Sequence, residues 1–386
     1  MLNVLYLIPS LEKSGGMERV LSQKVNFLSK SNNYSVSIIT TEMEEGVSPF
    51  FSLDNNVKVV NFELFFNDKF QLHLFKKIIE TKKLLKTYRS LLLNYLEENN
   101  IDICISMGGK ELEFLYKLNH PCKKIYEAHF SKGIRTRTLL AAKGNHLLWR
   151  LIAKFREFQS IIQTRKLDQV IVLTEKSAHE WGITNDNVIV IPNPSSFKPM
   201  DKYPDYDSKK VIAVGRLEFE KGFDLLLQAW CIVRLKYPEW TLNIFGDGSQ
   251  KVHLEKMIIA NNLQEYVFLK GVSQNISEEL LKCSFLVLSS RYEGMPMVML
   301  ESMACGLPMV AFDCETGPAE LIHLNDCGLL VKNGSVDDLA NKIIQMIEND
   351  SERLNMSKAA KIKSEQYVIE KIMLRWEILF NKISNN

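Results

Sequence analysis

The sequence predicts an α/β protein with two domains, each built on a doubly wound parallel sheet. Short apolar runs alternate with longer amphipathic stretches along the whole chain. The runs are continuously apolar rather than alternating, which is typical of strands buried on both faces of a parallel sheet. The chain has 386 residues, and at roughly 100–200 residues per domain this length favours two domains.

Two series of candidate strands follow one another. The first series comprises residues 3–8, 35–40, 57–61, 101–106, 124–128 and 169–173, and the second comprises residues 211–214, 241–245, 267–270, 285–288 and 308–311. Between them, the stretch 192–207 contains four prolines and is the best candidate linker. We therefore expect a first domain at 1–195, a linker at 196–208 and a second domain at 209–366, with a cleft between the domains.

The end of the chain predicts a helix over residues 367–383. Its apolar positions fall on one face, at Ile372, Trp376, Leu379 and Ile383. Such a stripe needs a surface to cover. We therefore expect 367–386 to be a C-terminal helix that packs back toward the first domain.

Composition excludes several classes of protein. Hydrophobic residues make up 46% of the chain and charged residues 24%, which is the balance of a soluble globular protein. The formal charge of +2 is too near neutral for a dedicated nucleic-acid binder. Seven dispersed cysteines without a C-x-x-C pair indicate reduced thiols in a cytoplasmic protein and suggest no zinc site. We see no signal peptide and no run long enough to span a membrane, so we expect any membrane contact to be peripheral.

A pair of glycines follows the first strand and precedes an amphipathic helix. Gly15 and Gly16 would let backbone amides approach an anion at the helix N-terminus, where the helix dipole also favours negative charge. A simple tight turn is the alternative interpretation. A dinucleotide-dependent oxidoreductase is disfavoured, because the nearest match to G-x-G-x-x-G begins at Gly246 and has Lys251 in place of the third glycine.

Two cations follow the first strand of the second series. Arg216 and Lys221 lie at the carboxyl end of that strand, where open α/β sheets bind ligands. An arginine fork and a lysine point charge suit a diphosphate. The alternative is a pair of solvated surface cations, although positive charge at a helix start is locally unfavourable.

Two carboxylates flank the start of a later helix. Glu293 lies in the loop before this helix, which we expect Pro296 to begin and Gly306 to end. Glu301 lies inside the same mostly apolar helix and needs a partner if it is buried. Glu293 could bind sugar hydroxyls, and a ribose diol could be the partner of Glu301. The alternatives are a helix-capping role for Glu293 and a surface or salt-bridged position for Glu301.

Together these motifs resemble the retaining glycosyltransferases of family 4, and the resemblance covers nearly the whole chain. The motifs that carry it are Val214-Gly215-Arg216-Leu217, Glu220-Lys221-Gly222-Phe223-Asp224, Gly246-x-Gly248, Glu293-x7-Glu301 with Ala304-x-Gly306-x-Pro308, Gly15-Gly16-Met17-Glu18-Arg19 and Ile191-Pro192-Asn193-Pro194. The N-terminal motif is similar to that of enzymes that extend lipid-linked bacterial surface glycans. The resemblance implies the GT-B fold, with two Rossmann-like domains facing each other across a cleft. The first would hold the acceptor and the second the nucleotide-sugar.

The resemblance also implies site residues. The catalytic set is His129, Arg216, Lys221 and Glu293. The donor-binding set is Gly15, Gly16, Asn193, Gly215, Arg216, Lys221, Gly246, Gly271, Val272, Glu293, Gly294, Met295, Pro296, Met297 and Glu301. In this set the two cations bind the diphosphate, Glu293 binds the donor sugar and Glu301 the ribose. Residues 271–272 contact the nucleobase, and the Gly15-Gly16 turn closes on the diphosphate from the first domain.

The implied reaction is transfer of a hexose or N-acetylhexosamine from a nucleotide-diphosphate sugar to a glycan. UDP is the most frequent nucleotide in the family. Family members retain the anomeric configuration. We expect no cofactor and no metal ion. The D-x-D at 205–207 precedes a strand instead of following one, and we treat it as chance. A sugar-nucleotide epimerase of the same fold and a catalytically silent binding protein remain open.

His129 ends a first-domain strand and matches the position of a histidine near the donor sugar in the family. Many relatives continue with an aspartate, whereas Phe130 and Ser131 follow here. The alternative is a structural histidine, although the end of a parallel strand is where sites form.

The region 132–166 is strongly basic, with nine basic residues against one acid. Apolar residues recur in it at helical spacing, at Leu148, Leu151, Ile152, Phe155 and Ile162, and beside them Lys143, Arg150 and Lys154 form a basic stripe. The region 69–89 is similar. Such helices suit an anionic bilayer surface or the diphosphate of a lipid carrier. The alternatives are ordinary core beside solvated cations, and nucleic acid, for which no motif is present. We expect peripheral association with the cytoplasmic face of the membrane.

Overall fold

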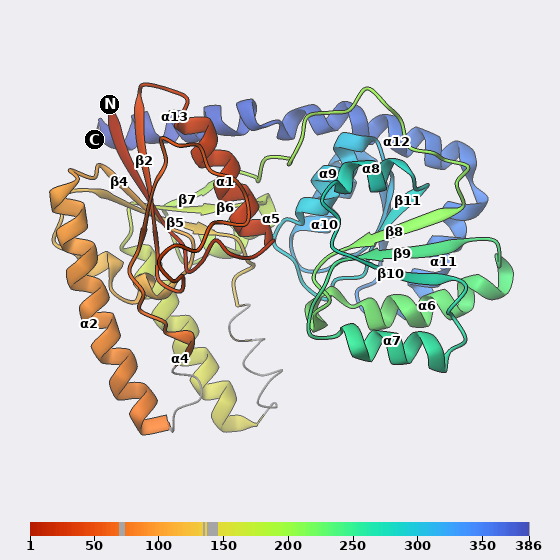
Figure 1. Ribbon diagram of the computed structural model, residues 1–386, viewed down its shortest axis with the longest axis horizontal. Coiled ribbons are helices and arrows are strands. Elements are labelled where there is room, and N and C mark those ends of the chain that lie inside the picture. The colour runs from red at the N-terminus through yellow and green to blue at the C-terminus, as the bar shows by residue number, and fades with distance from the viewer. Residues whose placement is uncertain (69–73, 134–135, 137–145, 386) are drawn as a thin grey trace. The chain divides into compact units, whose positions relative to one another are not determined.

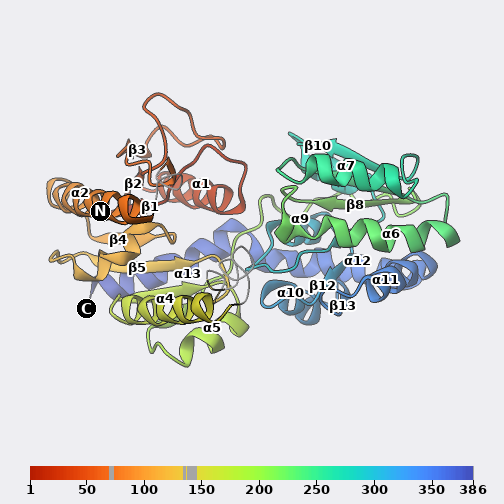
Figure 2. The same cartoon turned by 90° about the horizontal axis from the view of Figure 1, so that it is seen from below.

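The computed structural model describes residues 1–68, 74–133, 136 and 146–385. The chain divides into two compact units, of which the first comprises Met1–Pro192 with Ile369–Asn386 and the second comprises Asn193–Val368. Each unit is a parallel sheet with helices against it (Figures 1 and 2). The predicted fold class, α/β with two Rossmann-like domains, is confirmed.

The sheet of the first unit has the strand order β3-β2-β1-β4-β5-β6-β7, and its pairings are parallel. Its strands are β1 (Leu2–Leu7), β2 (Tyr34–Thr40), β3 (Lys58–Asn61), β4 (Ile103–Ser106), β5 (Lys123–Ala128), β6 (Gln169–Val172) and β7 (Val188–Val190). Its helices are α1 (Gly16–Leu28), α2 (Leu74–Glu98), α4 (Leu147–Arg165), α5 (Glu175–Gly182) and α13 (Ile369–Ser384).

The central strand β1 shows why the apolar runs are continuous. Val4 and Tyr6 pack with α1 and α13 in one core cluster, whereas Leu5 and Leu7 pack with α2 in another. Successive side chains of a strand point to opposite faces of the sheet. Both faces of β1 are therefore buried from Val4 to Leu7, and these four positions carry large hydrophobic side chains.

The sheet of the second unit has the order β10-β9-β8-β11-β12-β13, again with parallel pairings. Its strands are β8 (Lys210–Val214), β9 (Thr241–Phe245), β10 (Val267–Gly271), β11 (Phe285–Leu288), β12 (Met309–Phe312) and β13 (Gly328–Val331). Its helices are α6 (Phe223–Lys236), α7 (Lys251–Ala260), α8 (Ile276–Leu281), α9 (Met297–Cys305), α10 (Gly317–Asn325), α11 (Val336–Glu348) and α12 (Asp350–Ser364).

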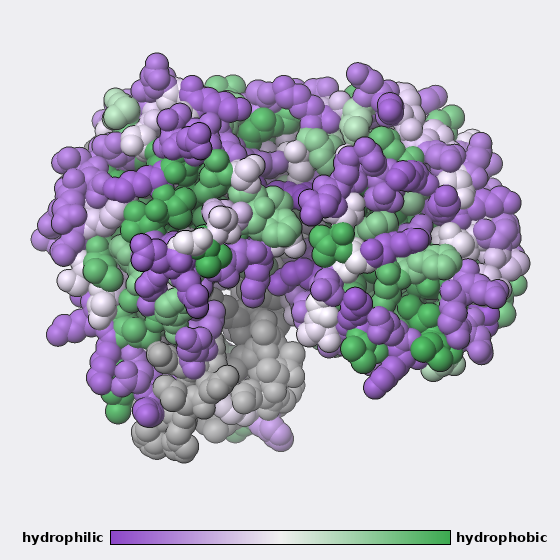
Figure 3. All heavy atoms as spheres, viewed as in Figure 1, coloured by the Kyte–Doolittle hydropathy of each residue, from purple (hydrophilic) through white to green (hydrophobic). Residues whose placement is uncertain are grey.

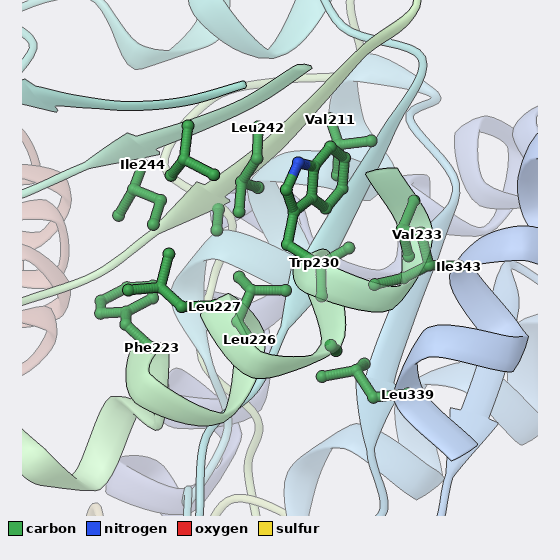
Figure 4. Packing of buried hydrophobic residues seen from close by; sticks show 14 of the residues in the cluster. Val211, Phe223, Leu226, Leu227, Trp230, Val233, Leu242, Ile244, Leu339 and Ile343 are labelled. Carbon is green, nitrogen blue, oxygen red and sulfur yellow. The ribbon is translucent and has the colours of Figure 1, made fainter. Parts of the chain in front are cut away.

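Helix α6 carries much of the core of the second unit. Leu226 and Trp230 are fully buried among residues of β8, β9 and α11, as Figure 4 shows. Trp230 lies against Val211 and Leu242 in this view. Burial of an aromatic side chain of this size contributes strongly to the hydrophobic stabilisation of a sheet–helix layer.

The structure contains two strands that the sequence analysis missed. β7 has only three residues, and β13 begins with Gly328. Short runs without a clear boundary are hard to tell from loops. Helix α9 also differs slightly, because it begins at Met297 and Pro296 is the residue before it instead of its first residue. Gly306 ends α9 in the left-handed conformation, as expected.

Residues 196–208, read from the sequence as a linker, belong to the second unit. The amide of Met200 donates to the carbonyl of Ala304, and that of Asp205 to the carbonyl of Leu281. The hydroxyl groups of Tyr206 and Ser357 are also hydrogen-bonded to each other. These bonds fix the segment against α9, α8 and α12, so proline content here marks an irregular but bound segment.

The C-terminal helix α13 belongs to the first unit. Its stripe of Ile372, Trp376, Leu379 and Ile383 is buried in the same cluster as α1. Both ends of the chain therefore lie in the first unit.

Most of the surface visible in Figure 3 is hydrophilic, with apolar groups in separate patches. One of these patches lies on the second unit over α7, where Val252 and Ile259 are exposed. Within the described residues, no helix is both long enough and apolar enough to cross a membrane.

Candidate functional site

The candidate site of the second unit lies at the carboxyl ends of β8 and β11. These strands are neighbours at the centre of the sheet, and the strand order reverses between them. In open α/β sheets the loops diverge at such a point and leave room for a ligand. The loops that follow β8 and β11 are the ones that carry Arg216, Lys221 and Glu293.

The structure brings Lys221 and Glu293 together although 72 residues separate them. Nζ of Lys221 lies 2.5 Å from Oε1 of Glu293, and the hydroxyl of Ser290 donates to the same oxygen at 2.7 Å. The two charged side chains are 20% and 12% exposed. Because Glu293 faces Lys221 and makes no cap bond to α9, the helix-capping interpretation of Glu293 is wrong.

A close backbone approach holds the Lys221 loop against β11. Gly222 has a φ of 62°, and a Cβ there would lie 2.1 Å from the carbonyl oxygen of Ser289. The hydroxyl of Ser289 in turn donates to the carbonyl of Lys221 at 2.9 Å. Only glycine fits both the conformation and the space. The position of the lysine is therefore set by the backbone.

An ion pair supports the same loop from the other side. Arg291 donates to both carboxylate oxygens of Asp224, at 2.9 and 2.6 Å, and its guanidinium lies 4.0 Å from the ring centroid of Phe219. Burial raises the pKa of Asp224, but the hydrogen bonds and charge of Arg291 outweigh it and hold this pKa below its ordinary value. This bidentate pair connects the start of α6 to the loop after β11.

Arg216 is held much less firmly. Its guanidinium pairs with Glu220 at 2.9 Å, and the arginine side chain is 56% exposed. An exposed ion pair of this kind is worth at most about 1 kcal/mol. Arg216 can therefore exchange Glu220 for a more strongly charged ligand at little cost.

Three glycines meet where β8, β9 and β10 end. A Cβ on Gly246 would lie 1.9 Å from the carbonyl oxygen of Gly215, and the amide of Gly246 donates to the carbonyl of Gly271 at 2.8 Å. Val272, which follows β10, is 56% exposed. The absence of side chains at this edge leaves the backbone open to a flat ligand.

Helix α9 presents its first amides beside Glu293. No side chain caps this N-terminus, while Thr316 fixes the loop before it by donating to the carbonyls of Glu293 and Gly294, at 2.6 and 3.0 Å. The side-chain amide of Asn193 donates to the carbonyl of Met295 at 3.4 Å. Amides of Gly294, Met295 and Met297 thus lie in a fixed loop at the positive end of a helix dipole, which suits an anion.

Glu301 is buried, with only 3% of its surface exposed. The hydroxyl of Ser196 donates to its Oε1 at 2.5 Å. Glu301 is therefore not a surface position, whereas the salt-bridged alternative stays open, and one of its partners in the structure is a hydroxyl group. A hydroxyl is also what a sugar would offer.

In the first unit, the Gly15-Gly16 turn begins α1 as expected. A Cβ on Gly15 would lie 2.1 Å from Oε2 of Glu18, so glycine lets this carboxylate fold back over the first turn. The helix dipole favours negative charge there. An anionic ligand at this turn would have to displace the carboxylate of Glu18.

His129 follows β5 and belongs to a buried charged network. Its Nε2 lies 3.3 Å from Oε1 of Glu127, and Nζ of Lys24 lies 2.6 Å from Oε2. Lys24 and Glu127 are 0% and 2% exposed, and the ring of Trp376 covers the ammonium group at 3.6 Å. Burial raises the pKa of Glu127, but Lys24 and His129 outweigh it and lower this pKa to about 2. Glu127 is thus a charged carboxylate beside the imidazole ring of His129.

Comparisons with known proteins agree with this geometry. Residues 198–363 match the family model described as glycosyl transferases group 1. The poly(ribitol-phosphate) alpha-N-acetylglucosaminyltransferase of Staphylococcus aureus is 30% identical over 349 residues, which are 86% of this chain and 68% of that protein. The chain belongs to the group 1 glycosyltransferases. The amylovoran biosynthesis glycosyltransferase AmsD of Erwinia amylovora is 29% identical to this glycosyltransferase over 99% of this chain and 100% of AmsD.

The fold of this glycosyltransferase also matches solved structures. A variant of TarM from S. aureus, crystallised with fondaparinux, alpha-GlcNAc-glycerol and UDP, superposes with a TM-score of 0.78 and 19% identity. The match covers 99% of this chain and 100% of that one. At this identity the likeness shows the GT-B fold alone.

Several residues that build the site were missed from the sequence. Lys24 had a signal, since it lies at i+4 from Val20 and i+3 from Leu21 on the apolar face of α1. A lysine on a buried face needs a buried partner. Ser290 and Thr316 could not be recognised from the sequence, because a hydroxyl residue in a loop has no distinctive spacing.

Two further expectations concern metals and the basic region. Among the described residues, no group of three or more His, Cys, Asp or Glu could hold a metal ion. Arg150 and Lys154 are exposed on α4. Lys143 lies outside the described residues.

Proposed function

We propose that this group 1 glycosyltransferase is a retaining, metal-independent hexosyltransferase or N-acetylhexosaminyltransferase of family 4. Its donor is a nucleotide-diphosphate sugar, with UDP as the nucleotide, and its product belongs to a surface polysaccharide. The observation that carries the proposal is the Lys221–Glu293 pair at the switch point, next to the first amides of α9. Two relatives support the assignment to surface glycans: one is named for amylovoran biosynthesis, and the other is named as a poly(ribitol-phosphate) alpha-N-acetylglucosaminyltransferase.

The donor diphosphate binds Arg216, Lys221 and the backbone amides of Gly294, Met295 and Met297. Both cations are reachable, because the side chain of Arg216 is 56% exposed and that of Lys221 is 20% exposed. Glu293 then binds the hydroxyls of the donor sugar. Glu301 binds the ribose in place of its bond to Ser196, and residues 271–272 contact the nucleobase.

Catalysis follows from the charge that develops during transfer. The bond from the anomeric carbon to the diphosphate breaks, so positive charge grows on the sugar and negative charge on the leaving group. Lysine, arginine and helix amides that are already in place stabilise this leaving group without reorganisation of solvent. The acceptor hydroxyl attacks the same face, and a phosphate oxygen takes its proton. The configuration is thereby retained, and no metal ion is required.

In the first unit, we assign His129 to the sugar and the Gly15-Gly16 turn to the diphosphate. The network of Glu127 and Lys24 supports the role of His129, because it places a carboxylate beside the imidazole ring at the end of a strand. The acceptor is a glycan carried on a lipid, and the enzyme meets it at the cytoplasmic face of an anionic membrane.

A binding panel tests the donor assignment. UDP-, GDP- and ADP-sugars are titrated into the full chain by calorimetry in the presence of EDTA, and each nucleotide is titrated alone. We expect UDP-sugars to bind without metal, and Glu293→Gln to weaken the sugar-nucleotide more than UDP itself. Glu348→Gln, which removes an exposed partner of Lys236, is the matched control. Binding of none of these nucleotide-sugars would overturn the proposal.

A further inference from the structure

Helix α4 exposes its largest apolar side chains. Leu147, Leu151, Phe155, Phe158 and Ile162 are 72%, 57%, 60%, 60% and 37% exposed. At 100° per residue these five positions fall within an arc of about 80°, and they extend along about 22 Å of helix. We call them the outer stripe of α4.

The face of α4 that packs on the first unit carries the small residues Ala153 and Thr164 beside the half-buried Trp149. Ala153 and Thr164 are each 1% exposed, and both lie on the side of the helix opposite the outer stripe. The hydroxyl of Thr164 donates to the carbonyl of Ser160 in its own helix at 2.9 Å. Helices of soluble domains normally turn their apolar face inward. In α4 this arrangement is reversed.

Among its described side chains, α2, the other basic helix of the first unit, lacks this feature. Helix α2 exposes Ile78, Ile79 and Leu91, which are 45%, 54% and 37% exposed. These positions are about 100° or more apart around the helix. They are scattered and form no stripe. The outer stripe is therefore a property of α4 and not of basic helices in this chain generally.

Charge indicates what covers the outer stripe. Arg150 and Lys154 are exposed beside the outer stripe on one side of α4, and Glu157, the single acid of α4, is half-buried near Arg150 on that same side. An apolar stripe edged by cations complements an anionic bilayer, with acyl chains for the apolar groups and phosphates for the cations. A second copy docked on the same face would bring the cations of both copies together.

Figure 1 shows that the N-terminal end of helix α4 extends beyond the strands of the first sheet. The stripe begins at that end, with Leu147. We propose that the outer stripe of α4 inserts into the surface of an anionic bilayer, parallel to the membrane plane, while Arg150 and Lys154 bind lipid phosphates. The inference rests on the proposed function in one respect, namely that membrane binding would serve to capture a lipid-linked acceptor. Membrane binding itself can be tested without any assumption about the reaction.

The test is co-sedimentation of the full chain with vesicles of phosphatidylglycerol and phosphatidylcholine, compared with pure phosphatidylcholine. We expect binding only to the anionic vesicles, and a loss of about 10-fold or more in Phe155→Ser/Phe158→Ser, since each exposed aromatic contributes apolar area to insertion. Leu235→Ser is the matched control, because Leu235 is 79% exposed on the second unit. Equal binding of the double variant and the wild type would overturn the proposal.

A second measurement reports insertion directly. In Phe158→Trp the new indole should shift to shorter emission wavelengths on addition of anionic vesicles and should be quenched by brominated lipids. If the indole is already shielded from solvent without vesicles, a segment of this chain covers the outer stripe, and the proposal is overturned. If light scattering shows that the wild type is a dimer and that Phe155→Ser/Phe158→Ser is a monomer, a second copy of the chain covers the outer stripe, and the proposal is likewise overturned. Nucleotide-sugar binding, measured on the same variants, should not change, so failure here is distinct from failure of the donor assignment.

Discussion

Lys221 and Glu293 illustrate how single residues make this site. Neither is deeply buried, and each would be an ordinary surface charge if the other were absent. Their loops hold them at 2.5 Å, and the hydroxyl of Ser290 shares the same carboxylate oxygen. A diphosphate that approaches Lys221 therefore meets an ammonium group whose position is already set, which lowers the entropic cost of binding.

Replacing Lys221 should separate binding from folding. Lys221→Ala removes one charge-assisted hydrogen bond to phosphate, worth about 1.5–3 kcal/mol, so we expect affinity for UDP to fall by roughly 10- to 100-fold and transfer to be lost. The melting temperature should change little. Lys236→Ala, which removes an exposed lysine paired with Glu348, is the control in calorimetric titrations. Unchanged UDP affinity in Lys221→Ala would contradict the diphosphate assignment.

The buried pair of Lys24 and Glu127 should behave in the opposite way. Lys24→Met leaves a buried carboxylate without its partner, at a cost of about 3–5 kcal/mol in the free energy of unfolding. Urea denaturation measures this cost. Lys24→Met/Glu127→Leu should recover most of it, because an apolar pair of similar volume needs no charge compensation. No recovery in the double variant would mean that the charges themselves stabilise the first unit.

The same network predicts a pH dependence. The pKa of Glu127 in the folded protein is lowered from 4.5 to about 2. A lowered pKa means that the carboxylate stabilises the fold above pH 4.5, and that this stabilisation is lost as pH falls toward 2. The difference in unfolding free energy between wild type and Glu127→Gln should therefore shrink between about pH 4.5 and pH 2. A difference independent of pH across this range would contradict the pairing.

At the scale of elements, the site depends on backbones that approach each other closely at the ends of strands. Gly222 touches the end of β11, and Gly246 touches the turn after β8. In both places the neighbour is a backbone carbonyl, which has no rotamer with which to move away. The elements that carry Arg216 and Lys221 are thus positioned by glycines as well as by the side chains of Ser289 and Arg291.

Two glycines at neighbouring strand ends give a matched comparison. Gly246→Ala would place a Cβ 1.9 Å from the carbonyl oxygen of Gly215, whereas Gly271→Ala would meet nothing within 4 Å. Gly271→Ala should cost about 1–2 kcal/mol, the penalty for a left-handed conformation. Gly246→Ala should cost clearly more, because the turn after β8 must shift. Thermal unfolding of the two variants tests this, and equal costs would contradict the close approach.

At the scale of the whole molecule, the chain leaves the first unit after Pro192 and returns to it at Ile369. The C-terminal helix α13 supplies Trp376 to the first core, where it also covers Lys24. The first unit is therefore incomplete until the last residues of the chain are made. Stability of this unit depends on residues far away in the sequence.

Trp376→Ala should destabilise the first unit by about 3–5 kcal/mol, the usual cost of emptying a buried aromatic site. In differential scanning calorimetry we expect its transition to fall by roughly 10 °C. Ile378→Ala, in the same helix but 60% exposed, should leave the transition nearly unchanged. Equal effects of the two variants would show that the stripe of α13 does not stabilise the first core.

Much of the fold could be predicted because it depends on local patterns. Buried strands such as β1 and β11 are continuously apolar, and the stripe of α13 has a helical period. The short strands β7 and β13 were not predicted, since their pairing depends on neighbours distant in the sequence. Likewise, Arg216 and Glu293 could be found from motifs, whereas the contact of Glu293 with Lys221 could not. The sequence also could not show whether the apolar stripe of α4 points toward the core or toward solvent, because periodicity identifies an apolar face but not what lies against it.

The most direct test of the central claim is the configuration of the transferred sugar. The full chain is incubated with the UDP-sugar that binds best, with EDTA and with methanol as a simple acceptor, and the methyl glycoside is identified by NMR. A methyl glycoside does not interconvert between anomers, so it records the stereochemistry of transfer. The account predicts the same anomeric configuration as in the donor, formed without metal. An inverted glycoside, a product that forms only when a divalent metal is added, or an epimerised UDP-sugar in place of a glycoside would contradict it.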